Sequence, residues 1–153
     1  MENSKFTIVT AISIVAIILS SIAVVMLLTN VKSEPQTTYS GQTKEFWVFT
    51  SDLPEFNETK MGMPHDVFST STITVTKGDA VIIHFYNTED IGADSHTFTI
   101  DKPYFINIVL QPGQNKTITF NADTSGIFNY VCTFHQPTMR GQLIVLEPPR
   151  TTS

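Results

Sequence analysis

The chain contains a single cysteine, Cys132, and two other soft or borderline donors follow it closely. In "NYVCTFHQPTMRGQLIV", residues 129–145, His135 comes three positions after Cys132 and Met139 comes four positions later. A turn that leaves a strand can fold donors with this spacing around one ion. Thiolate and thioether ligands favour Cu(I), and imidazole suits copper in both oxidation states. The segment therefore indicates a copper site more than a zinc site.

A copper site of the electron-transfer type needs one more histidine, because it combines two imidazoles and a thiolate in a plane with a long axial methionine. His96 follows an irregular loop and starts a predicted strand, so a rigid scaffold can present it to a second loop. His84 lies in the middle of a strand, on the side opposite the apolar residues. His65 lies in a long irregular segment. We expect His96 to be the second imidazole ligand, with His65 as the reserve candidate.

Other roles for the lone cysteine remain open from the residues alone. One cysteine cannot form an internal disulfide, so an intermolecular disulfide and an inert buried thiol are the alternatives to a metal ligand. A catalytic thiolate would need a base and an oxyanion site, and it favours a helix N-terminus or cationic surroundings. We therefore predict no catalytic residue. A binuclear copper centre is excluded because it needs two bridging cysteines.

The elements that must position these donors are short strands. From Glu45 onward, runs rich in β-branched and aromatic residues alternate with turn signals such as "KGD", "QPGQN" and "DTSG". The pattern predicts an all-β, two-sheet β-sandwich over residues 45–147, followed by a tail over 148–153. The candidate strands are residues 45–50, 72–77, 80–87, 96–101, 116–122, 127–132 and 141–147.

Alternation along these strands predicts which side chains face the core. The inward set includes Cys132, because it shares the parity of Phe128 and Tyr130. Residues 51–71 are predicted to form an irregular loop or a small excursion, and loops of that length are often functional. The other predicted inward residues are Ile73, Val75, Val81, Ile83, Phe85, Ile118 and Phe120.

The N-terminal part of the chain predicts a membrane anchor. Residues 6–28 carry no charge, and about 20 such residues suffice to span a bilayer as a helix. The run is longer than the apolar part of a signal peptide, and no A-x-A-like cleavage site follows it. We expect a cytoplasmic stub over residues 1–5, a transmembrane anchor over 6–28 and a flexible linker over 29–44. A cleaved or lipidated leader is the alternative.

The charge balance and two glycosylation sequons indicate on which side of the membrane the rest of the chain lies. After Lys32 there are 13 acidic and 7 basic residues, which gives no reason to expect nucleic-acid binding. N-x-T sequons at Asn57 and Asn115 are compatible with an external domain. We therefore expect a single-pass protein of the cell membrane, with its N-terminus inside and its copper domain on the extracytoplasmic side.

Over residues 45–147 the chain resembles the cupredoxins, the blue copper proteins of plastocyanin and azurin type. The resemblance rests on "DSHTF", "YVCTFHQPTM" and the closing "MRGQLIV". It implies a Greek-key β-sandwich and one bound copper ion, with His96, Cys132 and His135 as equatorial ligands and Met139 as the axial ligand.

A further similarity is to nitrosocyanin-like single-domain cupredoxins, through "DLPEFN", "KGDAV", "PGQNKTITFNADTSGIF" and "CTFHQP". In those proteins a glutamate ligand stands where this chain has His96, and the second loop ends in a histidine where this chain has Met139. Both departures imply a closed site with two imidazoles, a thiolate and a thioether.

These features predict a membrane-anchored mononuclear type 1 copper protein that exchanges electrons with redox partner proteins, rather than an enzyme. Thr97 is expected to form a hydrogen bond near the thiolate, and Phe134 to belong to a docking patch. Three alternatives remain: a copper-binding or delivery protein that uses Met61 and Met63, a nitrosocyanin-like redox enzyme with an open copper site, and an adhesion-type sandwich with a stray thiol. The oligomeric state stays open.

Overall fold

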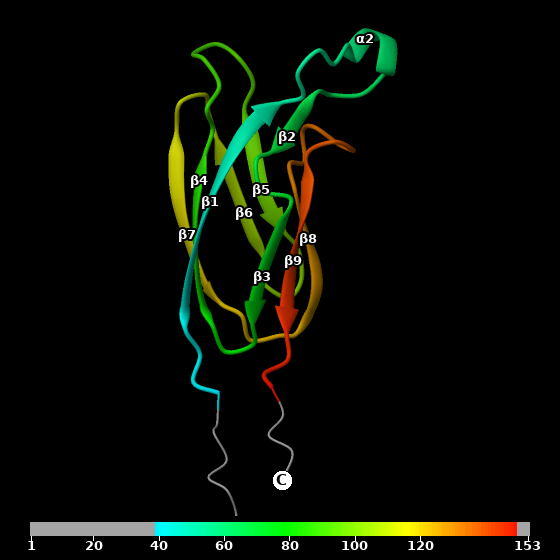
Figure 1. The fold of residues 1–153 in the computed structure, drawn as a ribbon. Helices are drawn as coiled ribbons and strands as arrows, with labels where there is room; N and C mark the ends of the chain where they lie inside the picture. The colour runs from blue at the N-terminus through cyan, green and yellow to red at the C-terminus, as the bar shows by residue number, and fades with distance from the viewer. Residues whose placement is uncertain (1–38, 150–153) are drawn as a thin grey trace, which may run out of the picture. The chain divides into compact units, whose positions relative to one another are not determined.

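The computed structural model describes residues 39–149 (Figure 1). The predicted stub and anchor, most of the predicted linker and the last residues of the tail lie outside this range. Within the described residues, no helix has the length and apolar character that a membrane crossing requires.

The described chain forms a β-sandwich of two mixed sheets, which confirms the predicted all-β class. One sheet has the strand order β2-β1-β4-β7 and the other β3-β9-β8-β5-β6. Each sheet contains one parallel pair, β1 with β4 and β3 with β9. The elements are β1 (Thr43–Asp52), α2 (Glu58–Met61), β2 (Asp66–Phe68), β3 (Thr72–Thr76), β4 (Ala80–Tyr86), β5 (His96–Ile100), β6 (Ile106–Leu110), β7 (Asn115–Asn121), β8 (Gly126–Val131) and β9 (Arg140–Leu146).

All seven predicted strands are present, and two further strands were missed. β6 has the expected alternation, because Ile106, Ile108 and Leu110 share one face, but it was not identified. β2 is only three residues long and lies inside the segment predicted to be irregular. The same segment contains α2, which begins after the N-cap Asn57 and ends at Gly62 in the left-handed conformation.

The core lies between the two sheets and is centred on aromatic rings. Phe98 contacts Tyr130, Phe85 and Phe68 with ring centroids 5.0–5.8 Å apart. The predicted parity holds: Val81, Ile83 and Phe85 are buried, as are Ile73, Val75, Ile118, Tyr130 and Cys132, while Phe120 and Phe128 are partly buried against the core. Cys132 therefore emerges from β8 on the inner side of its sheet.

A close approach between two strands fixes the end of the segment that carries the predicted ligands. Gly141 of β9 lies directly opposite Tyr130 of β8. A Cβ atom at Gly141 would lie 2.2 Å from Cζ of the tyrosine ring. The phenol also donates a hydrogen bond to the carbonyl of Thr70. Glycine is therefore required two positions after Met139, because the ring occupies the space of any side chain.

The domain begins slightly before the predicted boundary at residue 45. β1 starts at Thr43, and the backbone N–H of Gln42 donates to the buried carboxylate of Asp79 at 2.8 Å. The hydroxyl of Tyr39 donates to the same carboxylate. In Figure 1 the described chain starts and ends at the end of the sandwich opposite to α2.

Candidate metal centre

Three predicted donors converge at the α2 end of the sandwich. Nδ1 of His96 lies 3.9 Å from Sγ of Cys132 and 3.1 Å from Nδ1 of His135, and the Sγ to Nδ1 distance between Cys132 and His135 is 3.5 Å. His96 and Cys132 are fully buried, and the side chain of His135 is 15% exposed. The structure thus brings two imidazole nitrogens and one thiol sulfur into a small triangle.

The triangle is held by two neighbouring strands. His96 is the first residue of β5, and Cys132 directly follows β8, which pairs with β5 through Thr99 and Val131. The loop before His96 is fastened by the buried side chain of Asn87, which donates to the carbonyls of Asp94 at 3.0 Å and Leu110 at 3.2 Å.

The loop from Cys132 to Met139 is closed by its own hydrogen bonds. The N–H of Cys132 donates to the carbonyl of Met139 at 3.0 Å, and the N–H of Met139 donates to the carbonyl of His135 at 3.0 Å. The side-chain amide of Gln136 spans the loop by donating to the carbonyls of Cys132 at 2.8 Å and Met139 at 2.9 Å. The side chain of Met139 is fully buried. All four predicted ligands are therefore either in the triangle or in the loop that frames it.

The spacing of the three donors fits one metal ion. Metal–nitrogen bonds of about 2.0 Å and metal–sulfur bonds of about 2.3 Å place neighbouring ligand atoms roughly 3.3–3.8 Å apart in tetrahedral or trigonal geometry. The three observed separations, 3.1, 3.5 and 3.9 Å, bracket that range. A thiolate, two imidazoles and a thioether together suit copper.

The surroundings of the thiol favour its ionised form. Burial alone would raise the pKa of Cys132, but hydrogen bonds with His96, with the backbone N–H groups of Thr97 and Phe134, and with His135 outweigh burial and lower this pKa to about 6. The N–H of Thr97 lies 3.3 Å from Sγ. Thr97 was expected to act near the thiolate, and its backbone does so. Its side-chain oxygen instead accepts from the N–H of Thr133 at 2.7 Å.

Two carboxylates that the sequence analysis missed lie behind the imidazoles. Nε2 of His96 is 3.6 Å from Oδ1 of Asp66 and 3.6 Å from Oε1 of Glu89. Nε2 of His135 is 3.8 Å from Oδ2 of Asp66. Burial of His96 opposes its protonation, but the thiolate and the two carboxylates outweigh burial and raise the pKa of the imidazole. Burial and the charge of Asp52 raise the pKa of Glu89.

Parity could have identified Asp66. It shares the alternating "HDVF" run with Phe68, and an inward Phe68 implies an inward Asp66. Glu89 lies in an irregular loop before His96, where no pattern distinguishes it from the neighbouring acidic residues.

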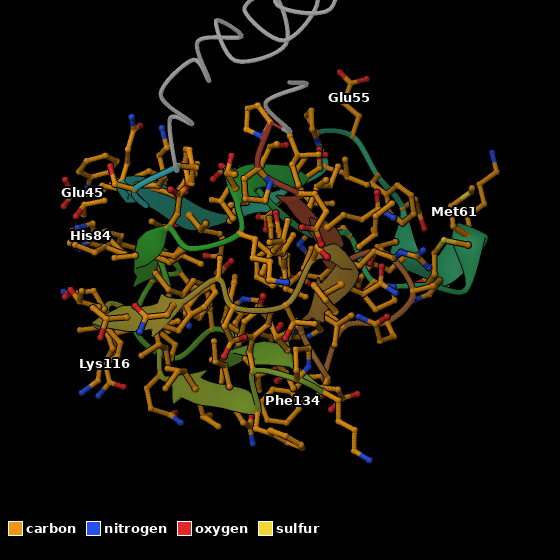
Figure 2. The ribbon with its side chains drawn as sticks, turned by 90° about the horizontal axis from the view of Figure 1, so that it is seen from below. Glu45, Glu55, Met61, His84, Lys116 and Phe134 are labelled. Atoms are coloured by element: carbon orange, nitrogen blue, oxygen red, sulfur yellow. The ribbon has the colours of Figure 1, made fainter. Side chains whose placement is uncertain are left out.

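The other two histidines lie outside the triangle. His65, the reserve candidate, contacts Glu58 through Nδ1 at 2.7 Å, and this hydrogen bond raises the pKa of His65 and lowers that of Glu58. His84 stacks on Trp47 with ring centroids 5.2 Å apart and contacts Glu45 through Nε2 at 2.7 Å. Figure 2 shows His84 beside Glu45 on one side of the domain and Met61 on the other. His84 is half-buried on the outer face of β4, which agrees with its predicted place opposite the apolar residues.

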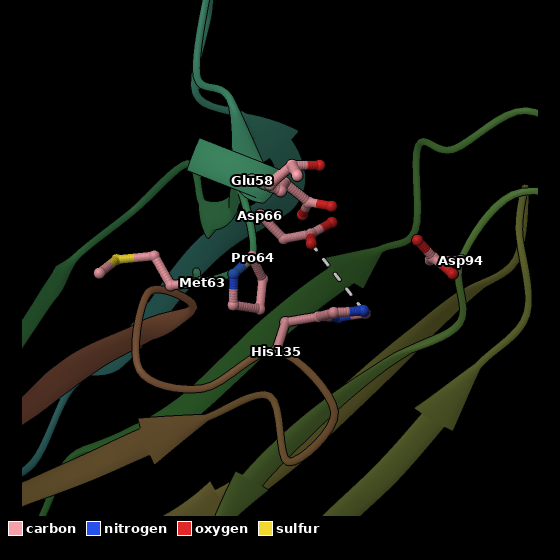
Figure 3. A pocket seen from close by; sticks show the side chains of 7 residues that line it. Glu58, Met63, Pro64, Asp66, Asp94 and His135 are labelled. Atoms are coloured by element: carbon pink, nitrogen blue, oxygen red, sulfur yellow. Dashed lines mark ion pairs between the residues drawn. The ribbon is translucent and has the colours of Figure 1, made fainter. Parts of the chain in front are cut away.

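A pocket of about 410 Å³ opens beside the triangle. Figure 3 shows the imidazole of His135 and the carboxylate of Asp66 facing each other across it, while the thioether of Met63 points away from that imidazole. Met61 is 52% exposed on α2. The two methionines of this segment therefore do not converge on the triangle. The pocket is lined by Glu58, Thr59, Met63, Pro64, Asp66, Asp94 and His135.

Known proteins share this architecture. A copper nitrite reductase from Nitrosomonas europaea superposes with a TM-score of 0.53 at 23% identity, over 69% of this chain and 42% of that chain. Auracyanin A, a "blue" copper protein from Chloroflexus aurantiacus, superposes with a TM-score of 0.50 at 19% identity, over 67% of this chain and 98% of that chain. A laccase from Botrytis aclada gives 0.51 at 18% identity, over 73% of this chain and 24% of that chain.

At these identities the likenesses establish the fold. The chain spans less than half of the nitrite reductase chain and about a quarter of the laccase chain, but it corresponds to nearly the whole of auracyanin A. The family described as cupredoxin-like domain matches residues 20–145. That match covers most of the chain and confirms the predicted family: the protein belongs to the cupredoxins.

Proposed function

We propose that the protein is a type 1 copper protein that carries single electrons, with His96, Cys132, His135 and Met139 as the ligands of one ion. The observation that carries this proposal is the triangle of two Nδ1 atoms and one Sγ atom with sides of 3.1, 3.5 and 3.9 Å. A bound copper ion would supply one-electron exchange between Cu(I) and Cu(II).

The chain contributes rigidity and the exclusion of water. His96 and Cys132 are anchored to adjacent strands of one sheet, and the 132–139 loop is closed by backbone and Gln136 hydrogen bonds. The buried Met139 side chain keeps solvent from the loop interior. Donors that keep their places in both oxidation states leave little to reorganise when an electron arrives or leaves, which favours electron transfer over ligand exchange.

His135 provides the route to a redox partner. Its side chain is the most exposed of the four proposed ligands, and the ring of the neighbouring Phe134, with a centroid 6.4 Å away, is 55% exposed. A partner protein that docks on Phe134 would approach the imidazole edge. The described chain begins at the end of the sandwich opposite to α2 (Figure 1). We propose that an N-terminal membrane anchor tethers the copper domain on the extracytoplasmic side.

A redox titration tests the proposal. The full chain, loaded with one equivalent of copper, is titrated with a reductant and reoxidised while visible absorption is followed. A reversible one-electron curve with full recovery of the colour is expected. Release of the metal on reduction would contradict an electron carrier and favour copper delivery.

A further inference from the structure

A single buried carboxylate faces both imidazoles of the proposed copper site. Asp66, at the start of β2, is 3% exposed. Its two oxygens divide between the histidines: Oδ1 lies 3.6 Å from Nε2 of His96, and Oδ2 lies 3.8 Å from Nε2 of His135. The two histidines come from different loops, so Asp66 is a common neighbour of both.

The Nε2 atoms need such a neighbour. Both Nδ1 atoms face the thiol, so in the metal-bound state each imidazole carries its proton on Nε2. Nε2 of His96 is buried and has no hydrogen-bond partner within residues 39–149. A buried N–H without an acceptor is costly, and carboxylates are common acceptors for the far nitrogen of metal-binding histidines. The N–H at Nε2 of His96 would gain an acceptor if its 3.6 Å gap to Asp66 closed slightly or if one water bridged the gap.

Asp66 is held in place by the sheet. β2 pairs with the end of β1, where Asp66 lies opposite Asp52, and the buried side chain of Phe68 anchors the strand in the core. The N–H of Leu53 donates to the carbonyl of His65 at 2.9 Å, which closes the same hairpin. The carboxylate therefore has a fixed position behind the site.

We propose that Asp66 is a positioning residue that lowers the reduction potential of the copper site. This inference rests on the proposed function. With a small closure of these gaps or a bridging water, the carboxylate would accept hydrogen bonds from both ligand imidazoles, and it places a negative charge behind them in a largely buried position. A negative charge there stabilises Cu(II) more than Cu(I), because the interaction grows with the charge of the ion.

Asp66→Asn is the informative variant, because it keeps the shape and one acceptor oxygen but removes the charge. We expect the ratio of Cu(II) affinity to Cu(I) affinity to fall by roughly tenfold or more, with a matching rise of the reduction potential and a retained visible band. Glu89→Gln is the partial control, since Glu89 approaches only His96, and a smaller shift is expected. Asp52→Asn is the matched surface control: its side chain is 53% exposed, so solvent screens much of its charge, and a much smaller shift is expected than for Asp66→Asn.

The outcomes separate this inference from the proposed function. If the unsubstituted protein cycles reversibly and Asp66→Asn has the same potential as Asp52→Asn, the inference is wrong and the electron carrier stands. If the unsubstituted protein forms no coloured copper site, the proposed function itself fails. If a variant binds copper too weakly for a redox titration, competition titrations measure its affinities for Cu(I) and Cu(II) separately. A larger loss of Cu(II) affinity than of Cu(I) affinity supports the role of Asp66, and an equal loss of both affinities contradicts it.

Discussion

The Nδ1 atoms of His96 and His135 lie 3.1 Å apart, although the two histidines are 39 positions apart in the chain. Two neutral imidazole nitrogens with facing lone pairs repel each other at that distance, so the arrangement requires a cation or a shared proton between them. The thiol of Cys132 completes the triangle. The folded chain therefore presents a site whose geometry suits an ion.

His135→Ala tests whether this imidazole is one of the metal ligands. The substitution removes one donor at the surface side of the triangle, so we expect copper affinity to fall by more than tenfold and the visible band to be lost. His84→Ala removes an imidazole that contacts Glu45 and stacks on Trp47, and it should leave affinity unchanged. Competition with a chelator of known affinity measures both variants. Equal affinities would exclude His135 as a ligand.

Met139→Leu tests the axial position. Leucine has nearly the same volume, so the buried site should lose less than about 1.5 kcal/mol of stability. Loss of the thioether should shift the visible spectrum and raise the reduction potential, since an axial donor tunes the site. Spectrophotometric redox titration of the copper-loaded variant provides the measurement. An unchanged spectrum and potential would show that another group occupies the axial position.

Gly141→Ala tests the contact that fixes the end of the ligand loop. The new Cβ would meet the ring of Tyr130, which is fully buried, so the variant should lose about 1–3 kcal/mol of unfolding free energy. Gln142→Ala, on the exposed face of the same strand, should change it by less than about 0.5 kcal/mol. Denaturant unfolding of the metal-free proteins distinguishes the two, and equal stabilities would contradict the proposed overlap.

Asp79→Asn tests the origin of acid sensitivity. Burial opposes ionisation of Asp79, but hydrogen bonds from Tyr39, Gln42 and Thr76 outweigh burial and lower its pKa. The ionised carboxylate therefore stabilises the folded state above the ordinary pKa of about 4, and this contribution is lost as pH falls through the lowered folded-state value.

The unfolding free energy of Asp79→Asn should fall below that of the unsubstituted protein by about 1–3 kcal/mol at pH 7. The difference should shrink as the pH falls below about 4. Asp101→Asn, at an exposed position, is the control and should show no such convergence. A difference for Asp79→Asn that stays constant from pH 7 to pH 2 would contradict the argument.

Spacing and parity carried most of the sequence-based prediction. The Cys132, His135 and Met139 spacing predicted the loop that carries three of the proposed ligands, and strand parity placed Cys132 inward and His84 outward, as found. These signals work because local sequence separation limits where a turn can place its side chains. The sequence favours His96 over His65 because a strand start next to a loop is a rigid place for a ligand.

The missed features depend on contacts between distant segments. β2 is held by the end of β1, and its three residues are too few for their alternation to identify a strand. Asp66 and Glu89 acquire their roles only because that hairpin and the loop before β5 meet behind His96. Such convergence is a property of the tertiary fold. Parity with Phe68 indicates that Asp66 faces inward, but no local pattern predicts that Asp66 and Glu89 meet behind His96.

The central claim is that Cys132, His96, His135 and Met139 bind one redox-active copper ion. The most direct test compares the absorption and electron paramagnetic resonance spectra of the copper-loaded chain with those of Cys132→Ser. We predict one equivalent of copper with intense visible absorption in the unsubstituted protein and loss of that absorption in the variant. A colourless unsubstituted protein, or a coloured Cys132→Ser variant, would contradict the account.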